Sequence, residues 1–251
     1  MKKKLTVIQA LLLCVFLICA AYLSKYFYDL NSARQNFDEL RKEVRAKTPE
    51  DASGAYEEEY AEDGVLVQYD ELYQKNNDFR GWLTIPDTTI DYPVVKSTDN
   101  EFYLNRDFYK NKQPSGIPFI DYECGDDSLN LIIYAHNMKD GSMFSSLSKY
   151  TDKNFLDSHN VIKYDTLTEY TEYEIFAVLR TTIGAQNEFK YHEYASLTDE
   201  EMYNEYISKV KALSVHKTDI TPEFGERLLT LSTCAYNTQN ERLVVVARKK
   251  N

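Results

Sequence analysis

The chain opens with an uninterrupted apolar run. Leu5 to Ser24 carries no charged residue, and Lys2, Lys3 and Lys4 precede it. About twenty such residues are enough to cross a bilayer as a helix. A cleaved signal peptide and an uncleaved anchor both begin this way, and the length of the run favours the anchor. We therefore expect a single-pass protein of the cell membrane, with residues 1–4 in the cytoplasm, a transmembrane signal-anchor over 5–24 and the remainder outside.

Beyond the run, apolar residues recur at alternating steps of three and four, which predicts one face of a helix. They are Leu23, Tyr26, Leu30, Ala33, Phe37, Leu40 and Val44. This face either packs on the protein's own domain or forms a stalk or a dimer contact. Residues 25–65 are expected to be an extracellular helical stalk and linker, with the linker at Thr48 to Gly54. The folded domain is then expected over 66–251, entered through a short helix at Tyr69 to Asn77.

From Gly81 onward the pattern changes to short β-branched and aromatic runs bounded by turn residues, which predicts strands. The eight expected strands are Trp82–Ile85, Ile90–Val95, Ile117–Ile120, Leu131–Ala135, Val161–Tyr164, Tyr173–Thr182, Leu228–Cys234 and Leu243–Arg248. One helix is expected over Ser142–Tyr150 and another from Thr198, with Glu201 completing a capping box. The second helix lies between strands six and seven. Eight short strands can close into a barrel, which leaves no exposed edge.

Composition narrows the function classes. The formal net charge is −11, which argues against nucleic acid as a partner of the folded part. The soluble part has two cysteines, Cys124 and Cys234. A disulfide between them would silence any reactive thiol. The chain has no Cys-x-x-Cys or His-x-x-x-His spacing and no dense acidic cluster in the mid-barrel loops, so we expect neither a metal nor a cofactor.

The candidate chemistry lies at the ends of three predicted strands. Cys234 ends the run Thr-Leu-Ser-Thr-Cys, Arg242 opens the next strand, and His136 follows the strand ending at Ala135. A nucleophilic thiol needs a proton-transfer partner and a cation for developing negative charge. Such a Cys and His commonly meet in space, not in sequence. Each residue alone is more often structural, but the three together indicate catalysis.

These residues resemble the active site of a sortase. The segments Phe79–Pro86, Ile90–Val95 and Asn100–Leu104 are similar to class B members, and the resemblance runs from about Leu66 to Lys249. It implies a mainly β fold: a closed eight-stranded sortase-type barrel with N-terminal helices and a helix between strands six and seven, preceded by one transmembrane helix.

The resemblance also implies a reaction. A sortase cleaves the C-terminal sorting signal of a secreted protein after Thr, holds the acyl group as a thioester, and transfers it to an amine of a peptidoglycan precursor or stem peptide. Here it implies Cys234 as nucleophile, His136 as acid and base, and Arg242 as the cation that holds the oxyanion. It suggests Ser232, Thr233, Asn100 and Leu104 as substrate-binding residues. Two alternatives stay open: a thiol protease that hydrolyses the same signal, and a catalytically silent surface-binding module.

Overall fold

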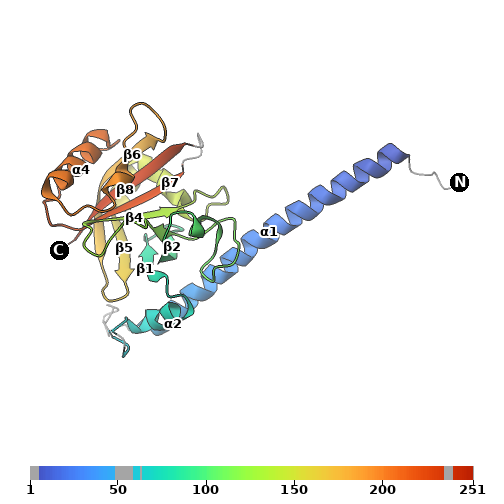
Figure 1. Ribbon diagram of the computed structural model, residues 1–251, viewed down its shortest axis with the longest axis horizontal. Helices are drawn as coiled ribbons and strands as arrows, with labels where there is room; N and C mark the ends of the chain where they lie inside the picture. The colour runs from blue at the N-terminus through green and yellow to red at the C-terminus, as the bar shows by residue number, and fades with distance from the viewer. Residues whose placement is uncertain (1–5, 49–58, 63, 235–239, 251) are drawn as a thin grey trace.

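The structure is a computed structural model that describes residues 6–48, 59–62, 64–234 and 240–250, with the backbone alone described at Cys234. Residues 1–4 and most of the expected linker from Thr48 to Gly54 lie outside these ranges. Figure 1 shows a barrel with a long helix, α1, extending away from it toward the N-terminus.

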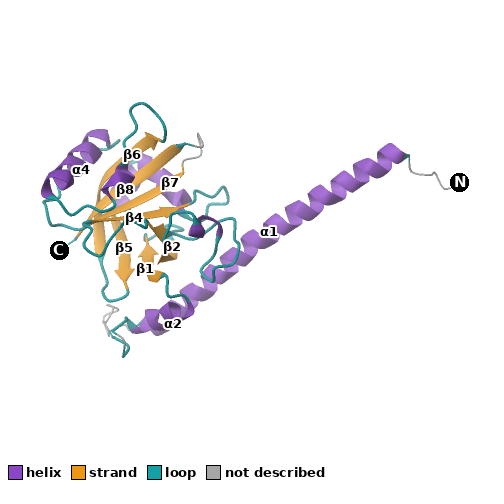
Figure 2. Cartoon of the chain, in the orientation of Figure 1, coloured by secondary structure: helices purple, strands orange, loops and turns teal. Residues whose placement is uncertain are grey.

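Eight strands form one closed barrel, which confirms the expected fold. Each strand overlaps one of the predicted runs. Around the barrel the order is β1-β2-β3-β4-β7-β8-β6-β5, and Figure 2 shows the strands in orange. The strands are β1 (Phe79–Thr84), β2 (Asp91–Lys96), β3 (Phe119–Ile120), β4 (Asn130–Ala135), β5 (Val161–Thr166), β6 (Glu172–Thr182), β7 (Leu228–Cys234) and β8 (Glu241–Lys249).

Strand β7 lies between β4 and β8 and is buried from Leu228 to Thr233. It pairs parallel with β4, from Asn130 opposite Leu228 to Ala135 opposite Thr233. It pairs antiparallel with β8. Leu229 and Leu231 have no exposed surface. Because parallel neighbours point the same way, the carboxyl ends of β4 and β7 meet at one rim of the barrel, where the start of β8 also lies.

Helix α4 (Glu200–Leu213) lies between β6 and β7, where the sequence predicts it. Its apolar face, including Tyr203, Tyr206 and Val210, is buried. The expected cap is wrong: Asp199, not Thr198, caps the helix, and its side chain accepts a hydrogen bond from the Met202 N–H. A carboxylate at the helix N-terminus satisfies a free N–H and complements the helix dipole.

The segment after β4 also differs from expectation. The helix predicted over Ser142–Tyr150 is the 3₁₀ helix η2 (Phe144–Thr151). It is followed by an unpredicted short helix, α3 (Lys153–Ser158), capped by the Asp152 side chain. Two further 3₁₀ turns are η1 (Phe102–Asn105) and η3 (Tyr191–Tyr194). Six residues are too few for a clear hydrophobic period, so α3 leaves little trace in the sequence.

Helix α1 (Val7–Lys47) is continuous through the apolar run and the periodic face that follows it. Its buried residues are Leu30, Ala33, Phe37, Leu40 and Val44. From Leu30 onward the predicted face therefore packs on the protein's own domain, beside the short helix α2 (Val67–Lys75), whereas Leu23 and Tyr26 are exposed. Ala33, Phe37, Leu40 and Val44 of α1 belong to the same hydrophobic core as the barrel, and the domain boundary expected at Leu66 stays a prediction.

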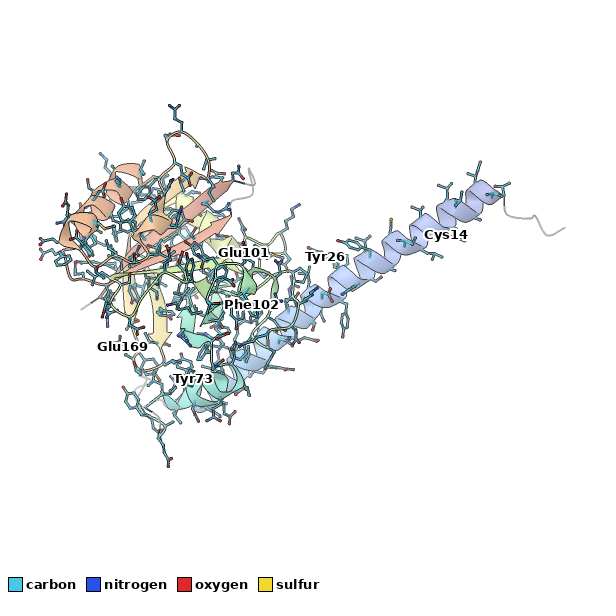
Figure 3. The ribbon with its side chains drawn as sticks, in the orientation of Figure 1. Cys14, Tyr26, Tyr73, Glu101, Phe102 and Glu169 are labelled. Carbon is cyan, nitrogen blue, oxygen red and sulfur yellow. The ribbon has the colours of Figure 1, made fainter. Side chains whose placement is uncertain are left out.

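The N-terminal part of α1 extends beyond the barrel with its apolar side chains exposed. Figure 3 shows Cys14 on this part and Tyr26 closer to the barrel. Among the described residues, this is the one helix long and apolar enough to cross a membrane, with a mean hydropathy of 2.4 in its best window. Leu12 and Phe16 are more than 60% exposed, a state that apolar side chains rarely take in water in such numbers.

Candidate active site

The register of three strands brings the candidate catalytic positions together. In the antiparallel β7–β8 pair, Cys234 lies directly opposite Arg242. In the parallel β4–β7 pair, Ala135 lies opposite Thr233, so His136 follows at the level of Cys234. The nucleophile position thus stands between a histidine on one neighbouring strand and an arginine on the other. Residues separated by about a hundred positions in sequence share one rim because of this topology.

Backbone and side-chain hydrogen bonds hold His136 in place. Its Nε2–H donates to the carbonyl oxygen of Leu104, in η1, over 2.8 Å. Its own carbonyl accepts from the Phe144 N–H over 2.9 Å. Since a carbonyl oxygen can only accept, the first contact fixes the proton on Nε2 of the neutral ring. The ring is therefore oriented from outside the β4–β7 pair, by the turn between β2 and β3.

Arg242 is also oriented by its own strand. Its Nη1 donates to the Glu241 carbonyl oxygen over 3.0 Å. The Glu241 carboxylate is in turn paired with Arg180 on β6 at 3.0 Å. A guanidinium keeps its charge at any physiological pH, so a cation stands beside the end of β7.

A cavity of about 220 Å³ opens at this rim. Six of the residues proposed from sequence line it: His136, Arg242, Ser232, Thr233, Asn100 and Leu104. The lining also contains residues that the sequence did not single out for the site: Phe119, Tyr134, Ala135, Ile183 and His192. Tyr191 also belongs to the lining.

Ser232 lies on the floor of this cavity. It is 1% exposed, and its hydroxyl shares a hydrogen bond of 2.6 Å with the Tyr191 hydroxyl. Alternation along β7 puts Ser232 on the same face as the Cys234 position. Ser232 is therefore both a bonded strand hydroxyl and a part of the cavity lining.

Two lining residues, Asn100 and Tyr134, belong to a polar cluster around a buried carboxylate. Asp121 is 2% exposed and accepts from the Tyr134 hydroxyl at 2.7 Å and from Asn100 Nδ2 at 3.1 Å. Asn100 Oδ1 in turn accepts from the Tyr122 N–H at 3.0 Å. Burial and the nearby Asp121 charge raise the pKa of Tyr134, so its hydroxyl stays protonated. This cluster fixes the amide of Asn100 at the cavity wall.

The other soluble cysteine has a structural environment. Cys124 is 2% exposed, its thiol donates to the Asn130 carbonyl oxygen, and its sulfur accepts from the Ile132 N–H, both at 3.4 Å. Burial raises the pKa of Cys124 to about 12. The thiolate is the reactive form of cysteine, so Cys124 is inert at neutral pH.

A second, larger hollow of about 460 Å³ lies between α1 and the barrel. Leu30, Phe37 and Tyr92 form its apolar wall. Its charged residues are paired with each other, as in the Arg34–Asp140 contact of 2.9 Å. None of His136, Cys234 and Arg242 lines it. Nowhere in the described part of the chain do three or more His, Cys, Asp and Glu side chains gather as metal ligands would.

Comparisons with known proteins agree with the barrel and its rim. The family model of the sortase domain matches residues 83–250. The chain belongs to the sortase family.

Its relatives also agree with the resemblance to class B. A sortase B of Listeria monocytogenes is 44% identical over 169 residues, which cover 65% of this chain and 65% of that protein. A sortase B of Staphylococcus aureus is 27% identical over 252 residues, covering 99% and 97%.

Solved structures extend the likeness to three dimensions. A sortase B from Bacillus anthracis in complex with AAEK1 has a TM-score of 0.73 at 35% identity, covering 89% of this chain and 98% of that one. A Staphylococcus aureus sortase B–substrate complex has a TM-score of 0.74 at 26% identity, covering 89% and 99%. A sortase B in complex with triglycine has a TM-score of 0.73 at 26% identity, covering 88% and 98%.

Proposed function

We propose that this chain is a membrane-anchored cysteine transpeptidase of the sortase B type. It cleaves a C-terminal sorting signal after Thr through a Cys234 thioester and transfers the protein to a peptidoglycan amine. The observation that carries the proposal is the register at the barrel rim, with Arg242 opposite Cys234 and His136 at the end of the parallel neighbour. A structure of a relative with substrate and another with triglycine support a peptide donor and an amine acceptor.

Each residue has a role that its chemistry allows. The Cys234 sulfur attacks the carbonyl carbon of the Thr in the signal, and the carbonyl oxygen becomes an oxyanion. The Arg242 guanidinium stabilises that charge by charge-assisted hydrogen bonds. His136 takes the Cys234 thiol proton onto Nδ1, gives it to the leaving amine, and later takes one from the attacking amine. The second attack releases the thiolate and forms the new amide bond.

The cavity lining supports the assignment of the substrate residues. Asn100 presents an amide fixed by Asp121 and Tyr122. Ser232 and Thr233 form the floor beside the thiol position, and Leu104 adds an apolar contact at the wall. A short extended peptide with alternating polar and apolar side chains suits such a surface.

The anchor supports transfer at a membrane. We propose that α1 spans the cell membrane with the barrel outside, which places the enzyme, a secreted substrate and a lipid-linked acceptor at one face. Holding all three at one surface raises their effective concentration. The net charge of −11 is consistent with a solvated domain outside the cell.

The test uses the full chain in detergent micelles with a small library of quenched sorting-signal peptides, with and without an added amine. We expect an amine-dependent ligated product, identified by its mass, that disappears in Cys234→Ala. Hydrolysis that no amine can divert would identify a thiol protease. Absence of any cleavage, with Cys234 inert to thiol reagents, would identify a silent binding module and refute the proposal.

A further inference from the structure

The turn that orients His136 is itself held by one short segment of the chain. Three successive carbonyls of η1 accept hydrogen bonds. The Leu104 carbonyl takes the His136 Nε2–H at 2.8 Å. The Tyr103 carbonyl takes the Ile117 N–H at 3.3 Å, and the Asn105 carbonyl takes the Gln113 N–H at 3.0 Å. Residues 113–117, called the clamp segment below, therefore fix the turn on both sides of the carbonyl that orients His136.

Gly116 lets the clamp segment lie against the turn. Its φ is +58°, in the left-handed region. A Cβ at this position would lie 2.6 Å from the Leu104 carbonyl oxygen and 2.7 Å from that of Tyr103. Both contacts are with backbone, which cannot rotate away as a flexible side chain can. A side chain at Gly116 must therefore displace the carbonyl that holds His136.

Gln113 ties the clamp segment to α1. Its side chain is 4% exposed, and its Nε2 donates to the Asp29 carbonyl oxygen over 2.9 Å. Its Oε1 is buried with no hydrogen-bond partner among the described residues. An unsatisfied buried acceptor opposes folding, so a leucine of similar size would serve stability better here. This favours a role for the amide in holding α1 and the clamp segment together.

We propose that Gly116 and Gln113 are positioning residues for the reaction. Gly116 sets the Leu104 carbonyl at the distance that holds His136 Nε2–H, and Gln113 joins this arrangement to the helix that continues into the apolar span. The inference rests on the proposed function in that His136 is the group that transfers protons. A misplacement of about 1 Å in such a group costs about a hundred-fold in rate.

The experiment uses the full chain in detergent micelles with ¹⁵N-labelled histidine. The protein has four histidines, and His136→Gln assigns the His136 signals. We expect neutral wild-type His136 to carry its proton on Nε2 and Gly116→Ala to show a mixture of both tautomers. The same preparations give kcat/KM for a cleaved sorting-signal peptide, which we expect Gly116→Ala to lower about a hundred-fold.

Gly225→Ala is the matched control. Gly225 also has a positive φ, +100°, but an added Cβ would have no atom within 4 Å. Both variants carry the cost of alanine in a left-handed conformation, and Gly116→Ala alone meets the turn. The proposal is overturned if Gly116→Ala keeps the wild-type His136 tautomer and the kcat/KM of Gly225→Ala.

Gln113→Leu provides a second variant in case Gly116→Ala does not fold. Its matched control is Gln68→Leu. Gln68 is also buried, donates to the Tyr170 hydroxyl at 2.7 Å, and has an unsatisfied Oε1. We expect Gln113→Leu to change the His136 signals and lower kcat/KM about ten-fold while Gln68→Leu does neither. Equal behaviour of the two leucine variants would refute the role of Gln113.

The two readouts separate this proposal from the proposed function. The tautomer of His136 is measured without substrate, so it reports positioning even where no peptide is cleaved. If the reaction depends on Cys234 but the His136 tautomer is the same in the clamp-segment variants as in the wild type, the proposed function stands. The positioning role is then overturned.

Discussion

Two hollows among the described residues differ in size and in what lines them. The larger, about 460 Å³, lies between α1 and the barrel and is closed by charged side chains that neutralise each other, such as Arg34 and Asp140. The smaller, about 220 Å³, lies at the barrel rim and contains His136 and Arg242 beside the end of β7. Volume alone would select the hollow that lacks the proposed catalytic residues.

What separates them is how their residues are brought together. The rim cavity is built by strand register, which holds backbone positions to a fraction of an ångström, as precise chemistry requires. The hollow under α1 lies beside the buried apolar face of that helix, called the seam below (Leu30, Ala33, Phe37, Leu40 and Val44). Burial of these side chains mainly contributes free energy of folding. We therefore expect substitutions at the rim to change rates, and substitutions along the seam to change stability.

Removing the thiol should have the largest effect. Cys234→Ala is expected to lower kcat/KM more than about ten-thousand-fold, because no other group in the proposed mechanism can carry the acyl chain. The fold should survive, since the change removes little volume. Cys124→Ala is the matched control and should keep its rate, because that thiol is buried and protonated. Peptide cleavage and a thermal melt of each variant decide the matter, and near wild-type cleavage by Cys234→Ala would refute the assignment.

Replacing the rim cation should have the next largest effect. Arg242→Lys keeps the charge but loses the planar fork, so we expect kcat/KM to fall about a hundred-fold. Arg180→Lys is the control: Arg180 pairs with Glu241, the neighbour of Arg242, but lies outside the rim cavity. Steady-state kinetics of both variants make the test, and equal rates would show that charge alone is needed.

Along the seam of α1 we expect the reverse, a loss of stability without a loss of rate. Leu40 has no exposed surface, so Leu40→Ala should lower the free energy of unfolding by about 2–5 kcal/mol. The exposed neighbour Glu39 supplies the control, Glu39→Ala, with little change. Denaturant unfolding measures the loss, and the rate per folded molecule should stay unchanged. A seam variant that lost rate without losing stability would contradict the expected difference between the rim and the seam.

The smallest expected effect concerns a carboxyl outside both hollows. Burial raises the pKa of Asp165 to about 6, although the Tyr69 hydroxyl donates to it over 2.9 Å. An unfolded Asp titrates near about 4. The folded state thus holds the proton more tightly, so this group favours folding below about pH 4 and loses that contribution as pH rises through about 6.

Asp165→Asn should remove this dependence. Above about pH 6 the variant should be more stable than the wild type by about 1 kcal/mol, a value reduced from the full shift because solvent reaches this half-buried group. Thermal melts at several pH values between about 4 and 8 measure the difference. A wild-type stability that rises over the acid half of this range more than that of the variant would contradict the assignment. Asp165 lies outside both hollows, so we expect its raised pKa to affect stability and not catalysis.

Much of the fold could be predicted from the sequence because the strands are short, β-branched and well separated by turns. The helix from Glu200 was also predictable from its apolar face. Two local features could not be predicted, the residue that caps this helix and the short helix α3. Asp199 is a better cap than Thr198 by virtue of its charge, and α3 is too short to show a period.

The site was predictable where a residue adjoins a strand end and not elsewhere. Cys234, His136 and Arg242 mark ends that pattern analysis can find. Ile183 reaches the cavity because the β6–β8 ladder brings its N–H to the Asn240 carbonyl, at 2.8 Å. His192 reaches it from η3. No local pattern encodes either position, because both depend on the closure of the barrel.

The continuous helix α1 fixes the distance between the apolar run and the barrel. The helix runs from Val7 to Lys47 without a glycine or proline, and its first buried contact is Leu30. At about 1.5 Å per residue, only about 10 Å of helix separates the end of the apolar run from the barrel. A helix of this kind in a bilayer works as a fixed spacer. In the proposed anchored arrangement it sets one height above the lipid at which a bound polypeptide presents its cleavable bond.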